Sequence, residues 1–165
     1  MANVTVAAGS GWREDFLFVG NHLALDFLNT CPVQSGEPLE LLPDFDTVLR
    51  WFQAAGLLSS RQVDCLGQKW GGSARARELT AAMRELREKL RKEILSWEDT
   101  GKRHRDTLDV LNDIMAKHPM LTRLKRELGG TTTEFWFQPR QPEGLLAPLA
   151  HTMASLFATA DRSRV

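Results

Sequence analysis

The residues best suited to chemistry lie in the segment GNHLALDFLNT, where an imidazole, an acid and an amide interrupt an apolar run. A helix beginning near His22 would turn 100° per residue, so His22, Asp26 and Asn29 would share one stripe. A carboxylate and an amide on one helical face can fix a polar ligand through charge-assisted hydrogen bonds. Asp26 and Asn29 are therefore candidate ligand-binding residues, with Trp51 as an apolar wall of the pocket.

The same side chains have two other interpretations. Asp26, Asn29 and Thr30 could hydrogen-bond the backbone of the proline-punctuated loop at 31–43, because buried polar groups need partners and a loop offers many. Alternatively, the face of His22, Asp26 and Asn29 could serve a small cytoplasmic enzyme. That reading requires a deep pocket and a perturbed ionisable group.

Other signatures of catalysis or metal binding are weak. Cys31 and Cys65 lie far apart in no paired motif, which predicts neither a disulfide framework nor a zinc site and fits a reducing cytoplasm. His22 is too far along its helix to activate Cys31 as a nucleophile. The histidines never pair at metal-ligand spacing with one another or with a cysteine. We therefore expect no enzymatic activity, metal or cofactor in this chain.

Composition narrows the class further. The 165 residues, 42% hydrophobic and 25% charged, suit one domain with a core. The net charge of zero gives no global attraction to nucleic acid or anionic membrane. The basic segment 102–106, with Arg75, Arg77, Arg87 and Arg91 before it, is diluted by acids and favours a solvated helix face. No apolar run approaches membrane-spanning length, so we expect a cytoplasmic protein.

These residues must be positioned by a mainly α fold, and local signals place its helices. Asp44 and Gly56 are a predicted N-cap and C-terminal stop for a helix from Phe45, and Ser59 with Gln62 forms a capping-box pattern for the next. A helix before Pro119 is expected to turn Leu108, Leu111 and Met115 inward, and a final helix tolerates Pro148 only in its first turn. We predict about six helices packed as a single irregular domain, with one small antiparallel β-hairpin.

The longest predicted helix spans about residues 73–97. Its apolar stripe recurs at steps of three and four, at Leu79, Met83, Leu86, Leu90, Ile94 and Trp97. The stripe could pack in the core of the domain or against a second copy, so a homodimer stays open.

The segment LKRELGGTTTEFWF predicts the hairpin. With Gly129 and Gly130 as its two loop residues, Leu124 would face Phe135 and Lys125 would face Glu134. The hairpin would then present one apolar face and one charged face.

The segment GNHLALDFLNT, followed in order by LLPDFDTVLRWFQAAGLL, LNDIMAKHP and GLLAPLAHTMASLF, resembles the ABATE-domain proteins of bacteria, the CGNR zinc-finger family. The resemblance extends from about residue 18 to 164. It is most specific where two groups of residues combine. These are Gly20, Leu25, Asp26, Asn29 and Thr30 on one side, and Trp51, Ala55, Gly56 and Leu57 on the other.

The resemblance implies a stress-induced transcription regulator with an N-terminal helical domain and a C-terminal zinc finger. This sequence ends at DRSRV with none of the finger's cysteines, so zinc and direct DNA contact would belong to a missing finger. We expect a flexible segment at 1–15, an ABATE-like domain at 16–161 and the start of a linker at 162–165. The expected function is a sensor domain that binds a small polar ligand or dimerises, with a purely structural dimerisation module as the alternative.

Overall fold

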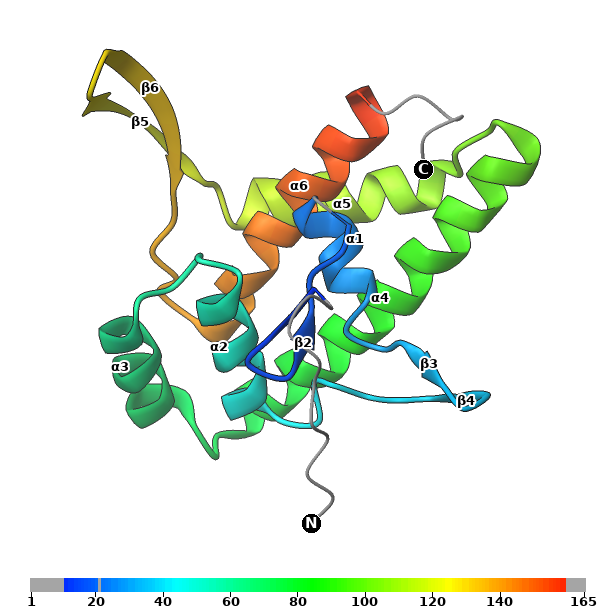
Figure 1. The fold of residues 1–165 in the computed structure, drawn as a ribbon, viewed down its shortest axis with the longest axis horizontal. Helices are drawn as coiled ribbons and strands as arrows, with labels where there is room; N and C mark the ends of the chain where they lie inside the picture. The colour runs from blue at the N-terminus through cyan, green and yellow to red at the C-terminus, as the bar shows by residue number, and fades with distance from the viewer. Residues whose placement is uncertain (1–10, 21, 160–165) are drawn as a thin grey trace. The chain divides into compact units, whose positions relative to one another are not determined.

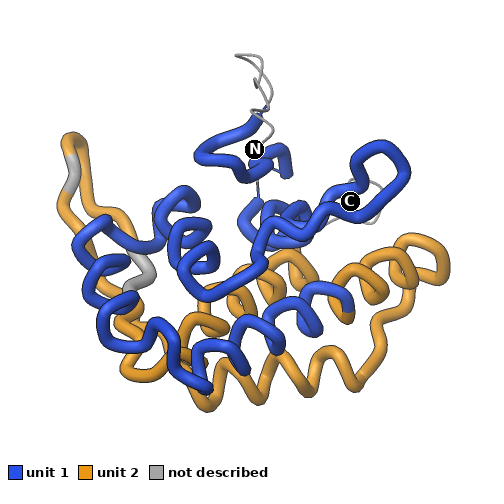
Figure 2. Tube along the Cα trace, turned by 90° about the horizontal axis from the view of Figure 1, so that it is seen from below, with its two compact units in different colours: residues 1–88 blue, residues 89–165 orange. Residues whose placement is uncertain are grey.

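The computed structural model describes residues 11–20 and 22–159 and confirms a mainly α fold (Figure 1). The described residues form six α-helices, one short 3-10 helix and three two-stranded antiparallel sheets. Two compact units, residues 1–88 and 89–165, divide the chain, and helix α4 belongs to both (Figure 2). Most of the predicted N-terminal flexible segment and the predicted linker start at 162–165 lie outside the described residues.

Unit 1 begins with small hairpins and continues into helices. Its elements are β1 (Trp12–Arg13), β2 (Phe16–Leu17), α1 (Leu23–Leu28), β3 (Val33–Gln34), β4 (Glu37–Pro38), α2 (Phe45–Ala54), α3 (Ser60–Trp70) and the first part of α4 (Ala74–Thr100). Strands β3 and β4 lie in the segment predicted as a loop. Their turn residues Ser35 and Gly36 both have positive φ, which is the pattern of a type I′ turn.

The predicted helix boundaries in unit 1 are confirmed. Asp44 caps α2 by accepting the Thr47 N–H at 2.8 Å, and hydrogen bonding by Thr47 lowers the pKa of the Asp44 carboxyl. Gly56, with φ of 75°, follows the end of α2. Ser59 and Gln62 form the reciprocal capping box of α3. Local sequence therefore determines where these helices begin and end.

Helix α4 buries the whole predicted apolar stripe. All six stripe residues, from Leu79 to Trp97, are at most 7% exposed within the chain itself. The stripe is thus buried within the chain itself.

Unit 2 contains the rest of α4 and the C-terminal elements. These are α5 (Arg105–Lys117), β5 (Leu121–Glu127), β6 (Gly130–Trp136), the 3-10 helix η1 (Pro142–Leu145) and α6 (Leu146–Thr159). Helices α5 and α6 pack together, and Pro148 lies in the first turn of α6, as predicted. Leu111 is buried, but Leu108 is 37% exposed, so its predicted inward position is wrong.

The hairpin of β5 and β6 exists, but each β5 residue pairs with a β6 residue two positions earlier than predicted. Leu124 pairs with Thr133 and Lys125 pairs with Thr132, which makes Leu128 and Gly129 the loop residues. Gly129 has φ of 106°, and Gly130 instead begins β6. A turn that needs positive φ only at its second central position accepts leucine at the first. The predicted pairings of Leu124 with Phe135 and of Lys125 with Glu134 are therefore not formed.

Across the described residues, the helices are too short or too polar for any of them to cross a membrane.

Candidate functional site

The candidate site in unit 1 is built around α1, and His22 is its N-cap. The His22 ring nitrogen Nδ1 accepts the Ala24 N–H at 3.3 Å, which satisfies one of the donors left free at the start of a helix. The three side chains of the predicted stripe, His22, Asp26 and Asn29, therefore do not share one role. His22 caps its own helix through Nδ1.

Asp26 is buried, at 8% exposed, and it binds the chain that precedes α1. Its Oδ1 accepts the backbone N–H of Gly20 at 2.9 Å. One interpretation of the sequence predicted that Asp26 hydrogen-bonds the backbone of the loop at 31–43. Asp26 does bind backbone, but it binds residue Gly20 before α1. A carboxylate that accepts a backbone N–H forms a charge-assisted bond, which fixes the entry of the chain into α1.

Gly20 is required by this close approach. A Cβ at residue 20 would lie 2.4 Å from the Cβ of Leu25 and 3.3 Å from Oδ1 of Asp26. Since the Cβ of Leu25 is bonded directly to the helix backbone, it cannot move aside as the far end of a side chain could. Gly20, Leu25 and Asp26 thus form a single contact, which gives a physical reason for three positions of the sequence motif.

Asn29 and Thr30 lie at the other end of α1. Asn29 is the C-cap, and its backbone N–H donates to the carbonyl of Leu25 at 3.0 Å. Thr30 is 1% exposed; its hydroxyl donates to the Phe27 carbonyl at 2.7 Å, and its own carbonyl accepts the Leu41 N–H at 2.9 Å. Thr30 therefore contacts the loop at 31–43 through its backbone carbonyl, whereas the side-chain bond to the loop backbone that one interpretation predicted is not what its hydroxyl makes.

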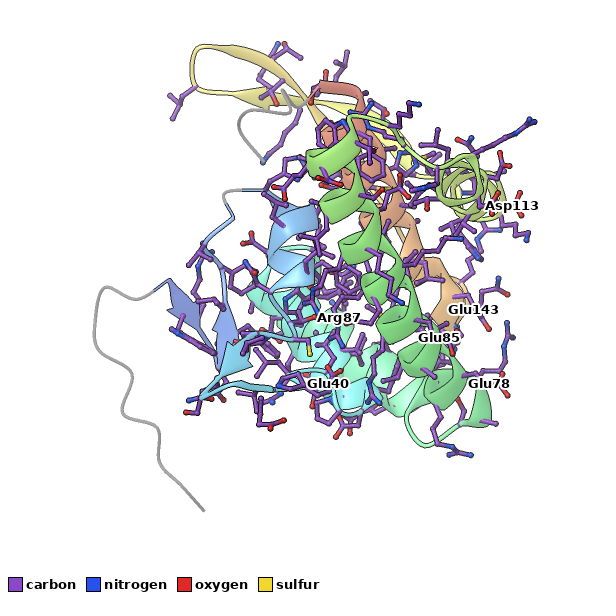
Figure 3. All side chains as sticks on the ribbon, turned by 90° about the vertical axis from the view of Figure 1, so that its right-hand side faces the viewer. Glu40, Glu78, Glu85, Arg87, Asp113 and Glu143 are labelled. Atoms are coloured by element: carbon purple, nitrogen blue, oxygen red, sulfur yellow. The ribbon has the colours of Figure 1, made fainter. Side chains whose placement is uncertain are left out.

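A buried arginine of α4 completes the anchor of that loop. Arg87, at 2% exposed, donates through Nη1 to the hydroxyl of Thr30 at 3.0 Å and to the carboxylate of Glu40 at 2.9 Å. Its Nη2 donates to the second oxygen of the same carboxylate, so the pair is bidentate, and the two side chains point toward one another in Figure 3. One guanidinium thus joins α4, the end of α1 and the loop.

The charges of this pair stabilise each other. Burial opposes the ionised form of Glu40, but hydrogen bonds from Arg87 and from the Leu42 N–H outweigh it and lower the pKa of the Glu40 carboxyl. Burial also opposes the charge of Arg87, yet its bonds to Glu40 raise the pKa of the guanidinium. Both groups are therefore charged at neutral pH.

Sequence reasoning missed Arg87 and Glu40 as functional residues, and it grouped Arg87 with a basic surface. That grouping is wrong, because Arg87 is buried. A signal was present: Arg87 lies four residues after Met83 and three before Leu90, within the apolar stripe of α4. A charged residue at a position that faces the core needs a buried partner.

Trp51, the predicted apolar wall, is fully buried in α2. Its ring stacks on Phe18 with centroids 6.2 Å apart, contacts Phe27 at 5.8 Å and meets Phe52 edge-on at 5.3 Å. Its Nε1 donor is buried and has no hydrogen-bond partner among the described residues. Trp51 therefore belongs to the aromatic core of unit 1, with one polar atom left unsatisfied there.

The remaining motif residues end α2. Ala55 is its C-cap and donates to the Trp51 carbonyl at 2.9 Å, and Gly56 donates to the Gln53 carbonyl at 2.8 Å. The motif thus consists of caps, close contacts and core positions. Within the described ranges, no three His, Cys, Asp or Glu residues gather as a group that could hold a metal ion.

Comparison with known proteins gives one family. The ABATE family model, described as "Putative stress-induced transcription regulator", matches residues 21–160. No curated protein and no solved structure matched the chain. The matched region includes α1, the Glu40–Arg87 pair, Trp51 and every helix of both units. The chain therefore belongs to the ABATE family.

Proposed function

We propose that this chain is the regulatory domain of a bacterial transcription regulator and that it senses a small polar ligand. The match of the ABATE model to residues 21–160 supports the regulatory part of the proposal, because it covers nearly all of the described structure. A regulator rather than an enzyme also agrees with the local geometry. His22 is engaged as a helix cap, and Asp26 binds backbone.

The unsatisfied indole of Trp51 supports a ligand in unit 1. A buried donor without a partner costs about 1–3 kcal/mol, so an acceptor supplied from outside the protein would recover that free energy. Asp26 adds a buried carboxylate on α1, next in sequence to Phe27, whose ring contacts Trp51. A polar ligand with one acceptor and one donor would suit these two groups, with Asn29 at the end of the same helix.

Regulation is tested in the source bacterium with the native protein carrying an epitope tag. Chromatin immunoprecipitation under stress should enrich discrete promoter regions, and deletion of the gene should change transcripts from those regions. If no region is enriched and deletion leaves the stress response unchanged, the regulatory function is refuted.

Ligand sensing is tested by thermal stabilisation of the purified protein against a panel of small polar metabolites. Trp51→Phe keeps the aromatic packing but removes the indole donor, and Arg61→Met changes an exposed side chain as a matched control. We expect a stabilising compound whose effect is lost in Trp51→Phe and kept in Arg61→Met. A compound that stabilises all three proteins equally, or a panel with no stabilising compound, would contradict sensing at this site.

A further inference from the structure

Unit 2 contains a hollow of about 550 Å³ at the base of its hairpin. Its walls come from the end of α5, the first residue of β5, the segment that follows β6 and the beginning of η1 and α6. The volume lies in the range of small-molecule sites. None of the predicted ligand-binding residues Asp26, Asn29 and Trp51 lines this hollow.

Several residues that line the hollow are apolar and buried. Phe137 is 9% exposed, and Pro139, Gly144 and Ala147 are buried. A Cβ on Gly144 would lie 3.1 Å from the Cβ of Pro139, so glycine allows η1 to approach this wall. Two prolines, Pro119 and Pro139, also line the hollow and restrict its backbone. The buried part of the lining is thus apolar and suits a compact apolar group.

The polar part of the lining is basic. Lys117 and Arg140 are exposed at its mouth, His118 is half-buried, and no carboxylate is among the lining residues. Asp113 lies 3.7 Å from Nζ of Lys117, but both side chains are at least 70% exposed. Such an exposed pair is weak and leaves the ammonium able to meet another anion. The side-chain amides of Gln138 and Gln141 add uncharged donors to the lining.

We propose that this hollow binds a small organic carboxylate with a compact apolar body. Arg140 would pair with the carboxylate, since a guanidinium matches that group in a bidentate manner, and Lys117 would add a second positive charge. The apolar body would rest on Phe137 and Pro139. This inference goes beyond the proposed function, because it uses only unit 2 residues and does not depend on a role in transcription.

A ligand bound in the hollow would also restrict the hairpin of β5 and β6. Leu121 begins β5 and Phe137 directly follows β6, so both ends of the hairpin line the hollow. Figure 1 shows the hairpin leaving α5 and returning toward α6 with its turn far from both helices. A ligand that contacts both ends would restrict the base of the hairpin, and hence the direction in which its exposed turn residue Leu128 is presented.

The test is a titration of the full ¹⁵N-labelled chain with benzoate, followed by amide chemical shifts. Benzyl alcohol is the neutral probe of nearly equal shape. We expect saturable shifts confined to residues 117–121 and 137–147, with benzoate binding at least about tenfold tighter than benzyl alcohol. Arg140→Ala should raise the Kd for benzoate about tenfold, because it removes the bidentate partner.

Arg126→Ala is the matched control, since Arg126 is an exposed arginine of the same hairpin outside the lining. It should leave the Kd within about twofold of the parent value. Non-saturating shifts, equal binding of the neutral probe, or equal losses in the two arginine variants would overturn the proposal. Because the spectra also report folding, a misfolded variant is recognised directly, and Arg140→Lys then tests the bidentate contact. If benzoate does not bind but promoter enrichment is intact, only the proposed carboxylate site in unit 2 is refuted, and the proposed regulatory function is unaffected.

Discussion

Replacing Arg87 with methionine should destabilise unit 1 more than any exposed arginine replacement. Methionine fills much of the same volume but removes the guanidinium that donates to the Glu40 carboxylate and to the hydroxyl and carbonyl of Thr30. Removing one partner of a buried ion pair costs about 3–5 kcal/mol. The Glu40 side chain is 31% exposed, so water would solvate part of its charge, and we expect about 2–3 kcal/mol.

In a chain of this length, each kcal/mol corresponds to about 2–4 °C in the melting temperature. The Arg87→Met variant should therefore melt about 4–12 °C lower than the parent when followed by far-UV circular dichroism. Arg61→Met is the control and should change the melting temperature little, because Arg61 is exposed. A double-mutant cycle with Glu40→Gln should give a coupling free energy of about 1 kcal/mol or more. Additive effects, or a melting temperature equal to that of the control, would refute the anchor.

The pH dependence of stability follows from the same pair. The pKa of Glu40 is lowered below its ordinary value of 4.5 in the folded protein, so the unfolded chain binds its proton more readily. The contribution of Glu40 is then fully present above its unfolded pKa and is lost as the pH falls through the folded pKa. Urea unfolding of Glu40→Gln should show a smaller loss of stability on acidification than the parent protein. An unchanged pH profile would contradict the ion pair.

Two further predictions concern close contacts in each unit. Gly20→Ala should lower stability by about 1–3 kcal/mol, because its Cβ would overlap Leu25; urea unfolding measures this, and stability equal to the parent would contradict the close approach. Glu93→Ala should weaken the start of α5 by about 1–3 kcal/mol, since the buried carboxylate accepts the His104 N–H at 2.6 Å and the Thr107 hydroxyl at 2.8 Å. Amide hydrogen exchange should then accelerate over residues 105–108, and unchanged protection there would show that Glu93 does not cap the helix.

The helix ends near the site could be predicted from sequence, because their chemistry is local. The caps at Asp44, Ser59 and Gly56 depend on neighbours within four residues, and all are found as predicted. The hairpin register was predicted wrongly, although its two strands were found. Two adjacent glycines allow more than one two-residue turn, and the sequence pattern does not distinguish between them.

The sequence by itself determined the helices of this protein, their boundaries and the family to which it belongs. Periodicity and capping act between residues one or two turns apart, so they can be read before the chain is folded. Only the tertiary structure decided that Asp26 binds Gly20, that Arg87 is buried against Glu40 and that Trp51 is enclosed by aromatic rings. Arg87 and Glu40 are 47 residues apart, and their partnership depends on how α4 packs against a distant loop. Local pattern shows that a residue faces the core, whereas packing between distant segments determines what it meets there.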